Sequence, residues 1–157
     1  MRRKICPSEI AGVAFSGWVD GPTFGFKLGG AGDVTASNRL WLEKQTQRVG
    51  SGVVVGGNVF IVNAGPGTAQ CMECQTGKVR WIERLEGGES WGSVVMAAGR
   101  LYVTSRKGVT TVFRPDPAKL EVLAMNDLGE PSNATPAISD GQIFLRTDRH
   151  LYCIAED

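Results

Sequence analysis

The chain has 157 residues, of which 42% are hydrophobic and 21% are charged, a composition typical of a globular protein with an ordinary core. Its 17 Lys and Arg residues nearly balance 16 Asp and Glu residues, so the formal net charge of +1 gives no reason to expect a nucleic-acid or anionic-membrane partner. The basic residues 1–4 are not followed by an apolar run, and no stretch reaches the length of a membrane span. We therefore predict neither a signal peptide nor membrane insertion for this chain.

Residues 1–46 predict the first and weakest of four similar units. Strands are expected at 12–16, 23–27 and 39–41, while the unit's own first strand is short or missing. The glycine-rich residues 28–38 interrupt the unit, and we interpret them as a solvent-exposed excursion between two strands.

Residues 47–88 predict a complete unit of four short strands. Two adjacent glycines, Gly56 and Gly57, separate the first two strands and favour a two-residue hairpin. The strands are expected at 52–55, 58–62, 68–74 and 78–82.

Residues 89–129 repeat this order, and residues 130–157 begin it again and stop one strand short. The third unit is expected to hold strands at 91–97, 100–105, 109–114 and 119–124, with residues 119–122 aligned on residues 78–81. The fourth unit is expected to hold strands at 133–139, 142–147 and 150–155.

The hairpin glycines Gly57, Gly99 and Gly141 are spaced by 42 residues. Each is followed by one polar residue, one aliphatic, one aromatic and one aliphatic residue. A period of this length, built from short strands, indicates the blades of a β-propeller. The predicted fold class is all-β, a partial β-propeller of about three and a half four-stranded blades.

Thr76-Gly77, followed by Trp81 and preceded by the glycine hairpin, resembles the repeat of the pyrroloquinoline-quinone (PQQ)-like β-propellers. The resemblance extends over about residues 12–157. The third unit departs from it, because Pro117-Ala118 replaces Thr-Gly and Val122 replaces the tryptophan. Some members of this superfamily are quinoprotein dehydrogenases that hold PQQ and calcium, and many others are non-catalytic scaffolds of exported proteins.

The resemblance implies a periplasmic or extracellular location and a protein that closes more blades than this chain has. Propellers close with about four to eight blades. The chain is therefore expected to resemble the C-terminal half of a longer propeller or to pair with another copy, in a homodimer that completes the ring.

The sequence offers little for catalysis or metal binding. Cys71 and Cys74 have the spacing of a zinc or redox pair, but residues three apart on a strand point to opposite faces. The adjacent cysteines and the grouped calcium ligands expected of a quinoprotein are absent. We therefore predict no catalytic residues, no metal site and no cofactor.

A candidate binding site follows from the hydroxyl residues that precede each hairpin glycine by six positions. In a propeller the first strand of each blade lines the central channel, so these hydroxyls and their neighbours are expected near the channel mouth. One interpretation is a site for a glycan or peptide around an exposed tryptophan; the other is that small residues are needed where blades crowd the axis. The candidate residues are Arg48, Ser51, Glu89, Trp91, Ser93, Asn133 and Thr135.

The function predicted from these observations is a binding or scaffolding module for protein or glycan partners, without enzymatic activity. The alternative is a C-terminal fragment of a quinoprotein oxidoreductase whose catalytic residues lie outside this chain.

Overall fold

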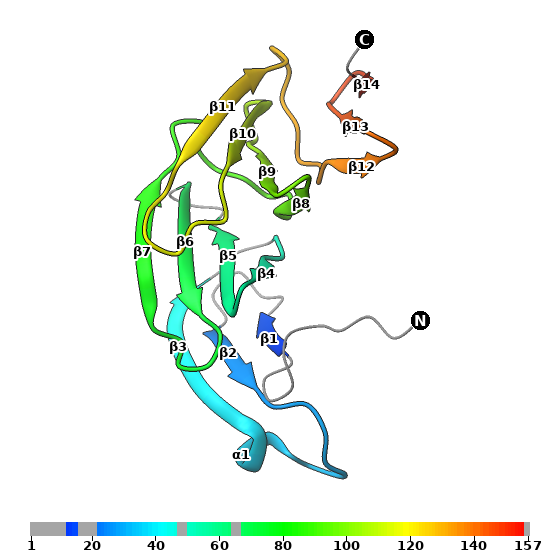
Figure 1. The fold of residues 1–157 in the computed structure, drawn as a ribbon. Coiled ribbons are helices and arrows are strands. Elements are labelled where there is room, and N and C mark those ends of the chain that lie inside the picture. Colours follow the sequence, from blue (N-terminus) through cyan, green and yellow to red (C-terminus); the bar gives the residue numbers. More distant parts are fainter. Residues whose placement is uncertain (1–11, 16–21, 47–49, 64–66, 156–157) are drawn as a thin grey trace.

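The computed structural model describes residues 12–15, 22–46, 50–63 and 67–155, which form four antiparallel sheets (Figure 1). We number the sheets as blades 1 to 4 in chain order. In each blade the hydrogen-bonded neighbours are consecutive strands, so every sheet is a simple meander.

Blades 2 and 3 have four strands each, whereas blades 1 and 4 have three among the described residues. Blade 1 holds β1 (Gly12–Phe15), β2 (Pro22–Phe26) and β3 (Arg39–Thr46), with the short helix α1 (Thr35–Asn38) before β3. Blade 2 holds β4 (Val53–Val55), β5 (Asn58–Val62), β6 (Thr68–Glu73) and β7 (Val79–Arg84). Blade 3 holds β8 (Val95–Ala97), β9 (Arg100–Thr104), β10 (Val109–Phe113) and β11 (Val122–Asp127). Blade 4 holds β12 (Ala137–Ser139), β13 (Gln142–Arg146) and β14 (Leu151–Ile154).

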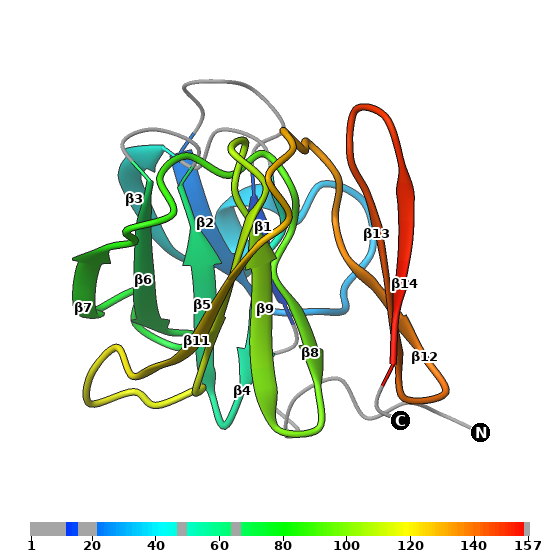
Figure 2. The ribbon, with the colours of Figure 1, turned by 90° about the horizontal axis from the view of Figure 1, so that it is seen from above.

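The four blades follow one another around an arc, with β4, β8 and β12 on its concave side and β3, β7 and β11 on its convex side (Figure 1). Figure 2 shows the hairpins that join β4 to β5, β8 to β9 and β12 to β13 along the lower edge of the blades, and the turn between β13 and β14 along the upper edge. The prediction of an all-β partial propeller is confirmed; α1 is the one helix among the described residues.

The three hairpins turn in the same way. Both central residues of each turn have positive φ, with values of 56° and 77° at Gly56 and Gly57, and 47° and 71° at Ala98 and Gly99. This is the backbone of a type I′ turn, whose twist matches that of the strands it joins. Asp140 and Gly141 repeat the pattern, so the hairpins predicted from the glycine period are confirmed.

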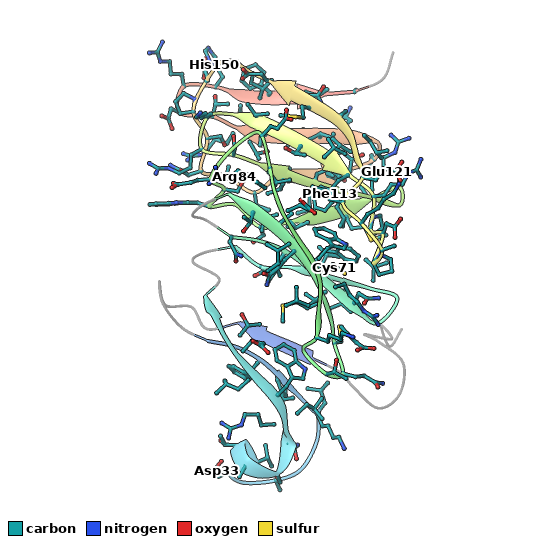
Figure 3. All side chains as sticks on the ribbon, turned by 90° about the vertical axis from the view of Figure 1, so that its left-hand side faces the viewer. Asp33, Cys71, Arg84, Phe113, Glu121 and His150 are labelled. Carbon is teal, nitrogen blue, oxygen red and sulfur yellow. The ribbon has the colours of Figure 1, made fainter. Side chains whose placement is uncertain are left out.

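The core lies between blades, because strand residues alternate between the two faces of each sheet. One face of blade 2 packs Phe60, Cys71 and Trp81 against Leu101 and other apolar residues of blade 3. Figure 3 shows two members of this cluster, Cys71 and Phe113, on neighbouring blades. The opposite face of blade 2 carries a second cluster, which packs against blade 1. Its buried members are Val59, Ile61, Met72 and Cys74, with Leu40 and Trp41 packed against them.

A tryptophan of the outer strand ties each of the first two blades to the next one. The Trp41 indole N–H of blade 1 donates to the Cys74 carbonyl of blade 2 over 2.8 Å. The Trp81 indole of blade 2 donates to the Asp116 carbonyl of blade 3 over 3.0 Å. We call this contact the indole bond. The tryptophan ring of each of these two blades packs against the outer turn of the next blade, which explains why the repeat combines Thr-Gly with a tryptophan. At Gly77 there is no room for a side chain, because a Cβ would lie 2.5 Å from Trp41 Cδ2.

The outer strand of blade 3 begins three residues later than predicted, and its alignment with blade 2 is shifted by two residues. The sequence alignment placed Val122 at the position of Trp81 and the strand at 119–124, but β11 begins at Val122. Trp81 pairs with Cys71, and the equivalent pair in blade 3 is Ala124 with Val112. The reason is the turn before β11, which is closed by a bond from Arg114 to Glu121, whereas the turn in blade 2 is closed from Glu73 to Lys78.

The inner strands are also shorter than predicted. Strands were expected to begin at 91 and 133, but β8 begins at Val95 and β12 at Ala137. The preceding residues run between blades and use their backbone groups for contacts across the blade boundary.

Candidate functional site

The predicted hydroxyl residues form a chain of hydrogen bonds from blade to blade. The Ser51 backbone N–H donates to Ser93 Oγ over 2.9 Å, and the Ser93 backbone N–H donates to Thr135 Oγ1 over the same distance. The Val94 N–H also donates to the Ser51 carbonyl over 3.0 Å. Two of the three hydroxyls therefore satisfy backbone donors of the neighbouring blade, and Ser51 and Thr135 remain exposed.

The backbone is crowded at the same place. A Cβ at Gly50 would lie 2.4 Å from the Gly92 carbonyl oxygen, and a Cβ at Gly92 would lie 2.5 Å from the Ala134 carbonyl oxygen. Such distances exclude a larger side chain at either glycine, so the inner strands meet through backbone. The candidate residue Arg48 lies outside the described residues, and Asn133 is exposed.

Trp91 and Glu89 lie beside an arginine that the sequence interpretation did not include. The Arg106 guanidinium is 4.8 Å from the centre of the Trp91 ring, and its Nη1 atom is 3.2 Å from Glu89 Oε2. The Arg106 backbone N–H also donates to the Glu89 carbonyl over 2.7 Å. Trp91 keeps 43% of its surface exposed, so a cation–π pair faces solvent. We call Glu89, Trp91 and Arg106 the mouth cluster.

The repeat itself contains the signal that could have found Arg106. It lies in the turn between β9 and β10, and in a meander this turn lies at the same end of the blade as the segment that enters the inner strand. Glu89 and Trp91 belong to that entering segment. Any side chain in the turn was therefore a candidate neighbour.

A second polar cluster occupies the same end of blade 4. The Thr147 hydroxyl is 2.6 Å from Glu130 Oε2, and His150 Nδ1 is 2.6 Å from Glu130 Oε1. The hydrogen bond from Thr147 is the main reason why the pKa of Glu130 is below its ordinary value; the bond and charge of His150 act in the same direction. Figure 3 shows His150 and Arg84 on the left side of the molecule, and Glu121 on the right side.

The cysteine pair is separated as the strand period predicted. Cys71 belongs to the cluster between blades 2 and 3, and Cys74 to the cluster between blades 1 and 2. Burial raises the pKa of the Cys71 thiol to about 11, so the thiolate that a metal or redox reaction requires is not formed near neutral pH. Within residues 12–15, 22–46, 50–63 and 67–155, no three His, Cys, Asp or Glu side chains are grouped so as to hold a metal ion.

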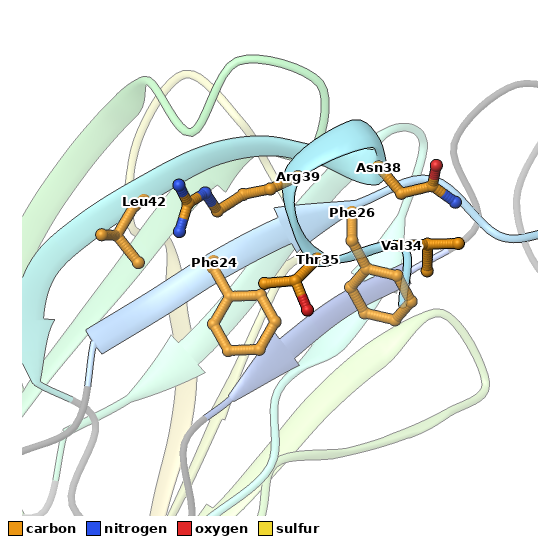
Figure 4. A pocket seen from close by; sticks show the side chains of 7 residues that line it. All are labelled: Phe24, Phe26, Val34, Thr35, Asn38, Arg39 and Leu42. Atoms are coloured by element: carbon orange, nitrogen blue, oxygen red, sulfur yellow. The ribbon is translucent and has the colours of Figure 1, made fainter. Parts of the chain in front are cut away.

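An apolar hollow of about 510 Å³ lies on the face of blade 1 that points away from blade 2 (Figure 4). Phe24 and Phe26 form its floor, and α1 and the start of β3 form its wall. The lining residues are Phe24, Phe26, Val34, Thr35, Asn38, Arg39 and Leu42.

A family model described as "Outer membrane protein assembly factor BamB" matches residues 66–157, which is more than half of the chain. The chain belongs to this family of PQQ-like propellers. No curated protein sequence matches the chain. In the described residues no helix is long and apolar enough to cross a membrane.

Solved structures show the same fold. BamB from Moraxella catarrhalis is similar over 99% of this chain and 46% of that chain, with 13% identity and a TM-score of 0.66. The glutaminyl cyclase from Myxococcus xanthus is similar over 81% of this chain and 54% of that chain, with 15% identity and a TM-score of 0.50. At these identities the likeness shows the fold alone. The chain spans about half the length of these two proteins.

Proposed function

We propose that this chain is a non-catalytic propeller segment that binds a protein partner at the channel mouth. The observation that carries the proposal is the mouth cluster, in which Arg106 holds the exposed indole of Trp91 from 4.8 Å and is itself held by Glu89. Tryptophan and arginine are enriched among the residues that dominate the energy of protein interfaces. Side chains that already contact one another in the free protein have less side-chain entropy to lose when a partner binds.

Membership of the family supports a protein as the partner and also supports a cellular location for the chain. The matching model carries the description of an outer membrane protein assembly factor. This description supports a protein partner and a periplasmic or extracellular location for the present chain.

The test is a selection of binding peptides from a random library, followed by calorimetric affinities for chain variants. Trp91→Ala and Arg106→Ala are each expected to weaken the best peptide by at least about tenfold, the scale of an interface hot spot. Arg114→Ala is the matched control, because Arg114 makes an exposed ion pair with Glu121 at the opposite end of blade 3. Peptides that bind all variants equally, or no binder at all, contradict the proposal.

A glycan is the second candidate ligand, since an exposed indole and the exposed Ser51 and Thr135 side chains could hold a sugar ring. A protein is favoured because the Thr135 and Ser93 hydroxyls already accept backbone hydrogen bonds. Saturable binding of an oligosaccharide that is lost in Trp91→Ala would favour the glycan.

We also propose that the chain holds neither PQQ nor calcium. Among the described residues, no three His, Cys, Asp or Glu side chains lie close enough together to hold a calcium ion. Cys71 is buried and stays a neutral thiol near neutral pH. Titration of PQQ with calcium is expected to give no saturable change in absorbance or heat. Binding at sub-micromolar concentration would favour the quinoprotein alternative.

A second copy of the chain is the other partner that we propose. The chain spans 46% of the similar BamB chain, so two copies have about the length of one complete ring.

A further inference from the structure

One face of blade 4 is not covered by any other described blade, although the equivalent face of blade 2 is buried. Phe144 pairs with Cys153 as Phe60 pairs with Cys71 two blades earlier. Leu151 corresponds to Ala69 in the same alignment. Ala69 is 1% exposed because blade 3 covers it, whereas Leu151 is 71% exposed. We call the outward surface of Phe144, Leu151 and Cys153 the trailing face.

Blade 1 presents the other half of a blade interface. Gly25 pairs with Trp41 as Cys71 pairs with Trp81, so Phe26 occupies the position of Met72 in blade 2. Met72 is buried against blade 1, but Phe26 and its neighbour Phe24 point away from blade 2 into the hollow of about 510 Å³. We call the outward surface of Phe24 and Phe26 the leading face.

Inside the molecule each interface joins the trailing face of one blade to the leading face of the next. Blade 4 has an uncovered trailing face, and blade 1 has an uncovered leading face. These two faces are therefore complementary in the same way as the faces that pack inside the molecule. They lie at opposite ends of the arc, so they do not meet within one copy of the described residues (Figure 1).

From this arrangement we infer that two copies of the chain form a closed ring, in which the trailing face of each copy packs on the leading face of the other. The inference rests on the proposed pairing of two copies and not on binding at the mouth. A two-fold axis makes the two new interfaces identical, and closure leaves neither face open. Leu151 and Phe144 of one copy would fill the hollow over Phe24 and Phe26 of its partner.

Several observations support a second copy as the occupant. The hollow has apolar walls and more room than one buried leucine needs, which fits a blade face carrying both Phe144 and Leu151. Exposed apolar faces of sheets are unfavourable in water and normally become covered. This chain covers 46% of the similar BamB chain, so two copies together have nearly the length of one ring.

The first measurement is the mass of the purified 157-residue chain by light scattering at micromolar to tens of micromolar concentration. A species of twice 16.8 kDa is expected. A monomer over this whole range overturns the inference, and so does a ladder of larger species, because unclosed head-to-tail contacts would produce open chains.

Two single variants then locate the interface. Phe26→Asp damages the leading face and Leu151→Lys damages the trailing face, and each alone is expected to raise the dimer dissociation constant at least about tenfold. Ile82→Asp is the matched control: Ile82 is 40% exposed on β7 of an interior blade and is expected to leave the mass unchanged. Equal masses for all three variants overturn the assignment of the faces.

Mixing the two single variants gives the sharpest result. A ring of one Phe26→Asp chain and one Leu151→Lys chain keeps one interface without any substitution and places Asp against Lys in the other. The mixture is therefore expected to recover the dimer, which also shows that both variants fold. A mixture that stays monomeric overturns the ring. Trp91→Ala, which tests the mouth, is expected to leave the mass unchanged, so the two proposals can fail separately.

Discussion

Blades 2 and 3 meet across a filled interface, whereas blades 3 and 4 meet across a partly empty one. On the side of blade 2 that faces blade 3, the Trp81 ring lies 6.2 Å, centre to centre, from the Phe60 ring of the same blade, and the Trp81 indole bond reaches Asp116 of blade 3. At the next boundary Ala124 replaces the tryptophan, and a groove of about 230 Å³ remains. It is lined by Tyr102, Thr110, Val112, Asn126, Leu128, Ile143, Leu145 and Ile154.

The difference shows how a repeat protein distributes its stability. Blades 2 and 3 have the same four-stranded meander, so the side chains at each boundary are the feature that we compare. We expect blade 4 to open before blades 2 and 3 separate, because fewer buried contacts hold it.

Trp81→Ala is expected to lower the free energy of unfolding by about 3–5 kcal/mol, because it empties a buried site and leaves the Asp116 carbonyl without its indole donor. Urea denaturation followed by circular dichroism measures the change. Trp91→Ala is the control, with an expected loss of about 0.5 kcal/mol, since its ring is exposed. Equal losses for the two variants would contradict the assigned role of the indole bond.

Substitution at the hairpin and turn glycines separates backbone strain from inter-blade packing. Gly99→Val is expected to cost about 1–3 kcal/mol from positive φ alone, because its Cβ would meet no atom within 4 Å. Gly77→Val is expected to cost more, because its Cβ would also collide with the Trp41 ring. Thermal unfolding ranks the two; an unchanged melting temperature for Gly99→Val would contradict the type I′ turn.

Ser93→Ala removes the acceptor of the Ser51 backbone N–H and is expected to cost about 1 kcal/mol. Ser51→Ala is the matched control, because no described residue donates to the Ser51 hydroxyl. Urea unfolding midpoints compare the two. A larger loss for Ser51→Ala would mean that the hydroxyl chain does not hold the blades together.

The smallest expected effect is a dependence on pH in blade 4. The pKa of Glu130 is lowered in the folded state, chiefly by Thr147, so the carboxylate stabilises the fold fully above its unfolded pKa of about 4.3. This contribution is lost as the pH falls through the lower folded-state pKa. The stability difference between the wild-type chain and Glu130→Gln should therefore shrink below about pH 4. Measuring both in a His150→Asn background removes the titration of the imidazole; a difference independent of pH would contradict the shift.

The sequence predicted the fold because the hairpin glycines and the strands around them repeat every 42 residues. The separation of Cys71 from Cys74 also followed from the strand period. The alignment failed at β11, where a turn two residues longer than its counterpart moved Ala124 into the place expected for Val122. Turn length is decided by local backbone geometry, which an apolar pattern does not record.

The candidate site was less accessible to sequence reasoning. Glu89 and Trp91 could be placed near the mouth by their position before the inner strand, but their contacts with Arg106 join segments that are separated along the chain. The same holds for Glu130 and His150, which are 20 residues apart. Whether the predicted residues bind a partner stays a prediction that the affinity measurements above can decide.

The indole bond also determines where the chain can be divided without loss. Each tryptophan belongs to one blade, but its acceptor belongs to the next, so the smallest piece that keeps a complete contact runs from the outer strand of one sheet to the outer turn of the following one. A truncation placed between two sheets would leave an unfilled turn on one fragment and an uncovered aromatic ring on the other. A cut in the inner hairpin of blade 2 or blade 3 also separates a tryptophan from its acceptor, whereas a cut in the outer turn between Cys74 and Trp81 keeps both indole bonds but separates β7 from β6.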